Sequence, residues 1–165
     1  MTAVGVLLLI AGAGAAGIAY ACALQRRAQE LRELEQAMEL LRYQMERFCL
    51  STQELARSLS GTASGAGGRL FARLSEELDR DDERTVSERW QAVIAPLDDA
   101  PRRALTEFGS VFGSFGAQEQ SAAAARTRDE LGRLAEAARE RAAQSGKLCV
   151  VLGFSAGAML SLVLI

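Results

Sequence analysis

Apolar segments without charge occupy both ends of this 165-residue chain, and helical patterns fill the sequence between them. Residues 1–25 carry no charged side chain, and residues 148–165 contain no ionisable group except the thiol of Cys149. Helical residues rise about 1.5 Å each, so both segments are about long enough to cross a bilayer core of about 30 Å. The pattern predicts a transmembrane helix at each end and one domain, residues 26–147, between them.

A cleaved signal peptide is the alternative for residues 1–25. Ala19-Tyr20-Ala21 and Ala21-Cys22-Ala23 resemble the small-residue sites at which signal peptides are cut. However, no Lys or Arg precedes the apolar run, and the run is longer than the ~7–15-residue core of a signal peptide. These two features favour a retained transmembrane helix.

The distribution of positive charge predicts the orientation in the membrane. All 19 Lys and Arg residues lie between Arg26 and Lys147. Loops rich in Lys and Arg stay on the cytoplasmic side of a membrane. We therefore expect a two-pass protein whose central domain is cytoplasmic.

The domain begins with apolar residues spaced three and four apart, which is typical of a heptad seam. The seam comprises Leu31, Leu34, Met38, Leu41, Met45, Phe48, Leu55 and Leu59. It could form a coiled coil that dimerises, or one helix of an intramolecular bundle, because both use the same packing. The bundle is favoured because further amphipathic helices follow and need a partner.

Residues 60–68, SGTASGAGG, form the clearest break in the pattern. A phosphate-binding loop would need Lys followed by Ser or Thr after the second glycine, whereas Arg69-Leu70 follows here. We expect a flexible linker between helices.

Short amphipathic segments follow the linker. The first has an apolar face of Leu70, Phe71, Leu74 and Leu78. The acidic run at residues 76–83 lacks the spacing and turn glycine of a calcium loop, so it is predicted to be a solvated helix end or turn. Thr85 or Ser87 can cap the next helix, in which Trp90 is predicted to anchor the core. Asp98 to Pro101 is typical of a loop turn that is followed by a new helix, with Pro101 in the first turn of that helix.

Residues 104–116 repeat a Phe-Gly pair at Phe108-Gly109, Phe112-Gly113 and Phe115-Gly116. Glycine in a helix costs about 1 kcal/mol relative to alanine, so close packing or a turn should explain these glycines. We expect the phenylalanines to fill the core and the glycines to let another helix approach. The helix should break near Gly116.

The last polar segment, residues 118–147, lacks proline and repeats Leu131, Leu134, Ala138 and Ala142 at helical spacing. It should run directly into the final span. No strand pattern occurs, so the predicted fold is all-α.

Small residues recur four apart in both predicted spans. Gly153, Gly157 and Ser161 lie on one stripe of the last span, and Ala13, Gly17 and Ala21 lie on one stripe of the first. Such ridges let membrane helices pack closely. Glycine is also simply common in membrane helices, which is the plainer explanation.

The composition disfavours several kinds of chemistry. The chain has no His, and its three Cys form no Cys-x-x-Cys pair. The commonest general base and metal ligand is therefore missing. The charges nearly balance, which does not suit binding to nucleic acid. We expect a protein that is not an enzyme and has no cofactor, metal or small-molecule substrate.

The order of these features resembles the stage III sporulation protein AB family. Leu105 to Gly113 (LTEFGSVFG) matches its L-x-x-F-G-x-x-x-G segment, and Leu152 to Gly157, followed by apolar residues to the end, also fits the family. The chain departs from the family pattern at Leu50-Ser51-Thr52, where Thr-Pro-Leu is expected. It departs again at Phe115-Gly116-Ala117, where an Asp is expected.

The resemblance implies a cytoplasmic antiparallel bundle of about six helices, similar to the domains of type II secretion and type IV pilus platform proteins. It also implies a role in endospore formation, within a channel complex between mother cell and forespore. The implied partners are a secretion-type ATPase, other membrane proteins of the complex and membrane lipid. The implied location is the mother-cell membrane that faces the forespore.

Three functions are compatible with these features. The first is a non-enzymatic platform subunit, the second is an enzyme with an unrecognised site, and the third is a coiled-coil membrane scaffold. The two anchors and the lack of a catalytic constellation favour the platform subunit.

Overall fold

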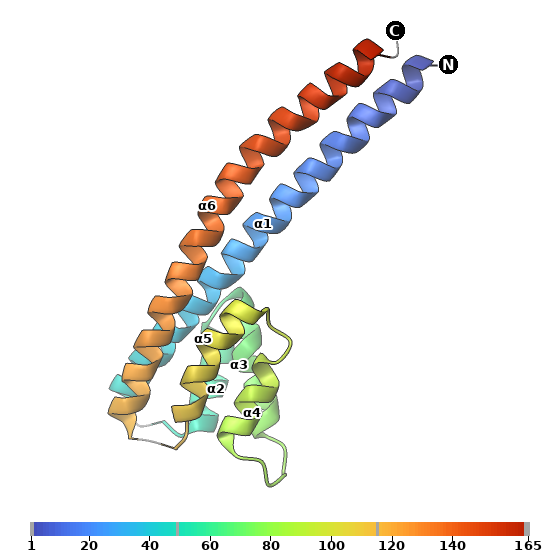
Figure 1. Cartoon of the computed structure of the whole chain (residues 1–165). Coiled ribbons are helices and arrows are strands. Elements are labelled where there is room, and N and C mark those ends of the chain that lie inside the picture. The colour runs from blue at the N-terminus through green and yellow to red at the C-terminus, as the bar shows by residue number, and fades with distance from the viewer. Residues whose placement is uncertain (1, 49, 115, 164–165) are drawn as a thin grey trace. The chain divides into compact units, whose positions relative to one another are not determined.

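The computed structural model describes the backbone of residues 2–48, 50–114 and 116–163. It describes the side chains of residues 12, 15–48, 50–114 and 116–144. Within these ranges the chain forms helices and no strand, so the all-helical prediction is confirmed. The six helices of Figure 1 are α1 (Thr2–Arg47), α2 (Thr52–Thr62), α3 (Gly65–Leu78), α4 (Val86–Ile94), α5 (Asp99–Val111) and α6 (Ala117–Val163).

The chain divides into two compact units. Residues 29–135 form the helical bundle, and residues 1–28 with 136–165 form the other unit. Among the residues searched, no helix is both long enough and apolar enough to span a bilayer. The side chains of residues 1–11, 13, 14 and 145–165 lie outside the described residues, which removes about half of the first predicted span and all of the second. The spans therefore stay a prediction.

The apolar seam of α1 is buried within the bundle from Leu31 to Leu41, whereas Met45 is half-buried and Phe48 is exposed. Leu31 and Leu34 are 7% and 3% exposed, and Met38 and Leu41 are completely buried. The seam thus packs against helices of the same chain, as the bundle interpretation expects. The expectation that Leu55 and Leu59 continue the register is wrong, because α1 ends at Arg47 and α2 begins at Thr52.

The interruption before α2 has a clear local cause. The Ser51 hydroxyl accepts a hydrogen bond from the Glu54 N–H, and the Glu54 carboxylate accepts one from the Ser51 N–H at 2.9 Å. This capping box satisfies backbone donors that a new helix leaves open, so it fixes a helix start at this position.

The glycine-rich segment is mostly helical, so the predicted linker over residues 60–68 is too long. Only Ala63 and Ser64 separate α2 from α3. A Cβ on Gly67 would overlap that of Ala37 in α1 and would lie 2.8 Å from the Glu33 carbonyl oxygen. The glycine therefore permits close approach of α1 and α3. The Glu33 carboxylate also accepts a hydrogen bond from the Ala66 N–H at 2.7 Å.

Aromatic residues from α3, α4 and α5 form the centre of the bundle. Trp90 is completely buried, and its ring centroid lies 5.2 Å from that of Phe108, 5.5 Å from that of Phe112 and 6.1 Å from that of Phe71. The Trp90 Nε1–H donates to the Leu105 carbonyl at 2.8 Å, so its one polar group is satisfied. Trp90 anchors the core, as predicted.

Two glycines near this cluster have different roles. A Cβ on Gly109 would overlap Cδ1 of Trp90 and would lie 2.8 Å from its Nε1, so glycine lets α4 and α5 meet. Gly113 has φ +80° and follows the end of α5, where it forms the turn. Because α5 ends at Val111 and α6 begins at Ala117, the predicted break near Gly116 is confirmed, although it begins earlier, at Phe112.

We expect Gly109→Ala to destabilise the bundle by about 1–3 kcal/mol, because the new methyl group overpacks the contact with Trp90. The measurement is chemical denaturation of the purified fragment 26–147, which we expect to fold alone. Gly61→Ala is the matched control, since Gly61 is an exposed helical glycine with no atom within 4 Å of an added Cβ. It should stabilise the fragment by up to about 1 kcal/mol. Equal effects of both substitutions would contradict the packing described for Gly109.

Candidate interaction surface

The aromatic and glycine residues singled out in the sequence come together in space, but inside the bundle. Trp90, Phe108, Gly109 and Phe112 are buried. Gly113 is exposed in the turn after α5. The four buried residues hold helices of the same chain together, and their side chains offer no surface to a partner. Gly153, Gly157 and Ser161 lie outside the residues whose side chains are described.

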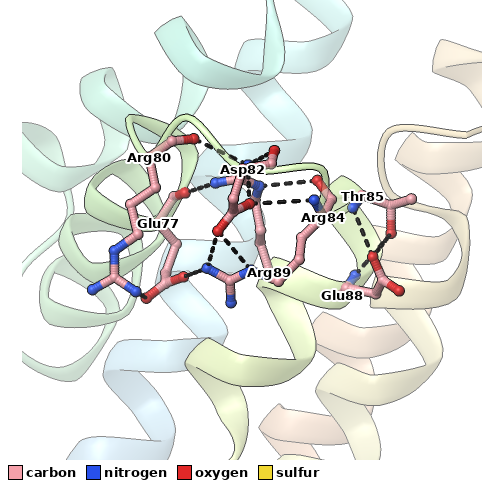
Figure 2. A network of polar contacts seen from close by, with 7 residues as sticks. All are labelled: Glu77, Arg80, Asp82, Arg84, Thr85, Glu88 and Arg89. Carbon is pink, nitrogen blue, oxygen red and sulfur yellow. Dashed lines mark hydrogen bonds and ion pairs between the residues drawn. The ribbon is translucent and has the colours of Figure 1, made fainter.

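A buried arginine organises the loop between α3 and α4 (Figure 2). The Arg89 side chain is only 7% exposed, and its guanidinium is surrounded by oxygen atoms. It donates to the backbone carbonyls of Glu77, Arg80, Asp82 and Arg84 and pairs with the Asp82 carboxylate at 2.6 Å. A planar cation with five donors suits this arrangement in a way that lysine does not.

Acidic residues of the same loop complete the network in Figure 2. Arg84 pairs with Asp82 at 2.6 Å and with Glu77 at 2.8 Å. The hydrogen bond from the Arg84 side chain lowers the pKa of the Asp82 carboxyl. Of the two caps predicted for α4, Thr85 is the one that forms, in a capping box with Glu88. The acidic run is a helix end and turn, as expected. Two of its carboxylates, Glu77 and Asp82, form ion pairs with arginines.

A second polar network joins α1 to α6 within residues 29–135. Glu39 pairs with Arg42 at 2.8 Å and with Arg128 of α6 at 2.9 Å. Arg42 also binds Glu46 at 2.7 Å, and the Ser121 hydroxyl donates to the Glu46 carboxylate at 2.7 Å. The Arg42 and Arg128 guanidinium groups hold the pKa of the Glu39 carboxyl at about 2, below its ordinary 4.5.

An open groove of about 660 Å³ lies beside this network, between the end of α1 and the start of α6. Small apolar side chains and one methionine form its apolar part, and Arg42, Glu46 and polar side chains form the rest. The lining residues are Arg42, Met45, Glu46, Ala117, Gln118, Ser121, Ala122 and Ala125. Such a lining can accept an apolar side chain from another protein.

The groove carries no recognisable catalytic chemistry. Its two charged residues are already paired, and its only hydroxyl is bonded to Glu46. Among the described residues, no group of three His, Cys, Asp or Glu side chains could hold a metal ion. The apolar part of its lining makes the groove a candidate for contact with a protein.

Neither network was anticipated from the sequence. Arg89 occupies a position next to Trp90 that gives no sign of burial in a single sequence. Glu39 and Arg128 are far apart along the chain, and no periodic pattern pairs them. The local signals that the sequence does contain are the capping sequences Ser51-x-x-Glu54 and Thr85-x-x-Glu88, which mark the starts of α2 and α4.

Comparison with known proteins decides the family. The family model described as stage III sporulation protein AB matches residues 2–165 of the sequence. The chain belongs to this family. Membership of the stage III sporulation protein AB family supports a role in sporulation.

The fold agrees with this assignment. A solved structure of stage III sporulation protein AB (SpoIIIAB) matches with a TM-score of 0.60 and 15% sequence identity. The match covers 69% of this chain and 94% of that chain. No curated protein matches the chain closely enough to indicate kinship.

The Glu39 network predicts a specific dependence of stability on pH. Because the folded state lowers the Glu39 pKa, its contribution is complete above about pH 4.5 and is lost as pH falls towards 2. Glu39→Gln should lower the melting temperature of fragment 26–147 at pH 7 by a few degrees. It should also flatten the decline in melting temperature between pH 4.5 and 2.

The matched control for this measurement is Glu119→Gln, at an exposed carboxylate in the first turn of α6. Thermal melts monitored by circular dichroism across the acid range report both variants. If Glu39→Gln left the slope as steep as in the wild type, the network would not be the source of the acid sensitivity.

Proposed function

We propose that the chain is a non-enzymatic platform subunit of a secretion-like channel complex that acts in endospore formation. In this proposal it works with a secretion-type ATPase and with other membrane proteins of the complex. It lies in the mother-cell membrane that faces the forespore, with the bundle in the cytoplasm. The family match over residues 2–165 is the observation that carries the proposal.

The continuity of the two long helices supports the anchored arrangement. α1 is one helix from Thr2 to Arg47, and α6 is one helix from Ala117 to Val163. Each apolar end segment is therefore joined to the bundle by uninterrupted helix. In this proposal the two apolar end segments anchor the chain in the membrane.

The side of the membrane follows from the charges. With all Lys and Arg between the spans, the bundle would lie in the cytoplasm, where a partner that hydrolyses ATP is also found. This shared location makes direct contact between the bundle and an ATPase feasible.

The titrating groups favour a non-enzymatic role. Among the described residues, the carboxylates with resolved shifts all have a lowered pKa: Glu39, Glu46, Glu54, Asp82 and Glu88. Arginine pairs, a serine hydroxyl or helix caps account for each shift. A general acid or base usually has a pKa raised towards neutrality, and these groups are shifted the opposite way.

The coiled-coil scaffold is less well supported. Its seam would need to be available to a second chain, but Leu31, Leu34, Met38 and Leu41 are already buried within the bundle. The same burial is what a compact platform domain requires.

A truncated chain tests the proposal in the native host. A strain without the gene should fail to form heat-resistant spores, and the full chain should restore them. Fragment 26–147 should accumulate in the soluble fraction and restore nothing, because it lacks both anchors. The ATPase should fractionate with membranes only when the full chain is present.

Two results would contradict the proposal. One is full recovery of spores with fragment 26–147, which would make the anchors dispensable. The other is unchanged membrane association of the ATPase in the strain without the gene, which would remove the chain from ATPase recruitment.

A further inference from the structure

Exposed apolar side chains in the bundle are concentrated at one place. In residues 29–135, the strongly exposed large apolar side chains that the structure describes are Phe48 (53%), Tyr43 (47%) and Leu50 (40%). All three lie within eight consecutive residues, at the end of α1 and in the connection to α2. Together with Arg47 they define the α1 corner.

Phe48 shows why this concentration is unusual. It lies seven residues after Leu41, which lies seven after Leu34, so it continues the buried seam. Leu34 and Leu41 are covered by the bundle, but about half of Phe48 is exposed. The apolar stripe of α1 therefore extends beyond the part that its own chain covers. Apolar surface left in this way is typical of a binding site.

Arg47 places an available positive charge in the same corner. Its guanidinium lies 5.5 Å from the centre of the Tyr43 ring, a cation–π contact. Among the residues that the structure describes, no carboxylate pairs with it. One turn earlier, by contrast, Arg42 is paired with both Glu39 and Glu46.

The carboxylates close to Arg47 in the sequence already have other partners. Glu46 binds Arg42 and Ser121, and Glu54 caps α2 through Ser51. Among the described residues, therefore, no carboxylate neutralises Arg47, and its side chain contacts the exposed ring of Tyr43. Exposed tyrosine, phenylalanine and arginine are residue types that protein interfaces favour, and all three occur here within six consecutive residues.

We propose that the α1 corner is the docking surface for a segment of a different protein. The segment brings a carboxylate to Arg47, and its apolar side chains cover Phe48 and Leu50. Met45 and Glu46, which line the groove, belong to the same last turns of α1. The inference rests on the proposed function only in expecting this partner to be another subunit of the complex.

Two other occupants fit the corner less well. Anionic membranes are recognised by clusters of about four to eight Lys or Arg residues, whereas the corner offers one unpaired arginine. A symmetric pair of copies would have to supply its own carboxylate to Arg47 from the same patch, and Glu46 and Glu54 are engaged elsewhere. An acidic and apolar segment of another protein meets both requirements.

Photo-crosslinking in the native host tests the inference with the full chain. A photoreactive phenylalanine analogue replaces Leu50, and in a control chain it replaces Arg73, an exposed residue of α3. We expect an adduct with one other protein from position 50 and none from position 73. The crosslinked segment should contain a carboxylate beside apolar residues.

A charge exchange then identifies the contact. Arg47→Glu in the chain labelled at position 50 should reduce the adduct at least about tenfold, as is common when charges of like sign are brought together in an interface. Changing the partner's crosslinked carboxylate to Arg should restore the adduct with Arg47→Glu. Arg73→Glu is the matched control and should leave it unchanged. Equal melting temperatures of the two variants would exclude misfolding as the cause.

The contrary outcomes are distinct. Adducts to lipid alone would assign the corner to the membrane, and adducts between copies of this chain would assign it to self-association. No adduct in cells that form spores normally, or failure of the charge exchange, would also overturn the inference. An adduct with a protein that has no part in sporulation would keep the docking surface but contradict the proposed function.

Discussion

The bundle depends on the contact between Trp90 and Gly109. Because residue 109 has no side chain, the indole can lie directly on α5, where its N–H reaches the Leu105 carbonyl. This position brings Phe108 and Phe112 against the indole ring and leaves Phe71 to close the cluster from α3. Three helices that would be marginal alone thereby share one core, since isolated helices of this length have little stability.

The same helix that carries Trp90 also fixes the loop beside the core. Arg89 precedes Trp90 in α4 and gathers four backbone carbonyls of the α3–α4 connection. At the other side of the unit, Glu39 and Arg128 join α1 to α6. A unit tied in this way can present the groove and the α1 corner in a fixed form, which lowers the entropy that a partner must overcome on binding. A rigid unit of this kind is suited to binding other proteins.

The sequence was most informative where burial follows helical periodicity. The seam to Leu41, the anchor role of Trp90 and the close approach at Gly109 all followed from spacing and residue type. The interruption before α2 was missed, although Ser51-x-x-Glu54 is a recognisable capping signature. The helical state of Gly67 could not be predicted, because it depends on the approach of α1 in three dimensions. The burial of Arg89 and the exposure of Phe48 likewise depend on which elements happen to cover them.

The central claim is that this bundle works as one component of a membrane assembly. The most direct test is native electrophoresis of a tagged, functional full chain, extracted from sporulating cells with a mild detergent. The account predicts that the chain migrates in a complex much larger than itself, together with other membrane proteins. Migration as a single chain, in cells that form spores normally, would contradict it.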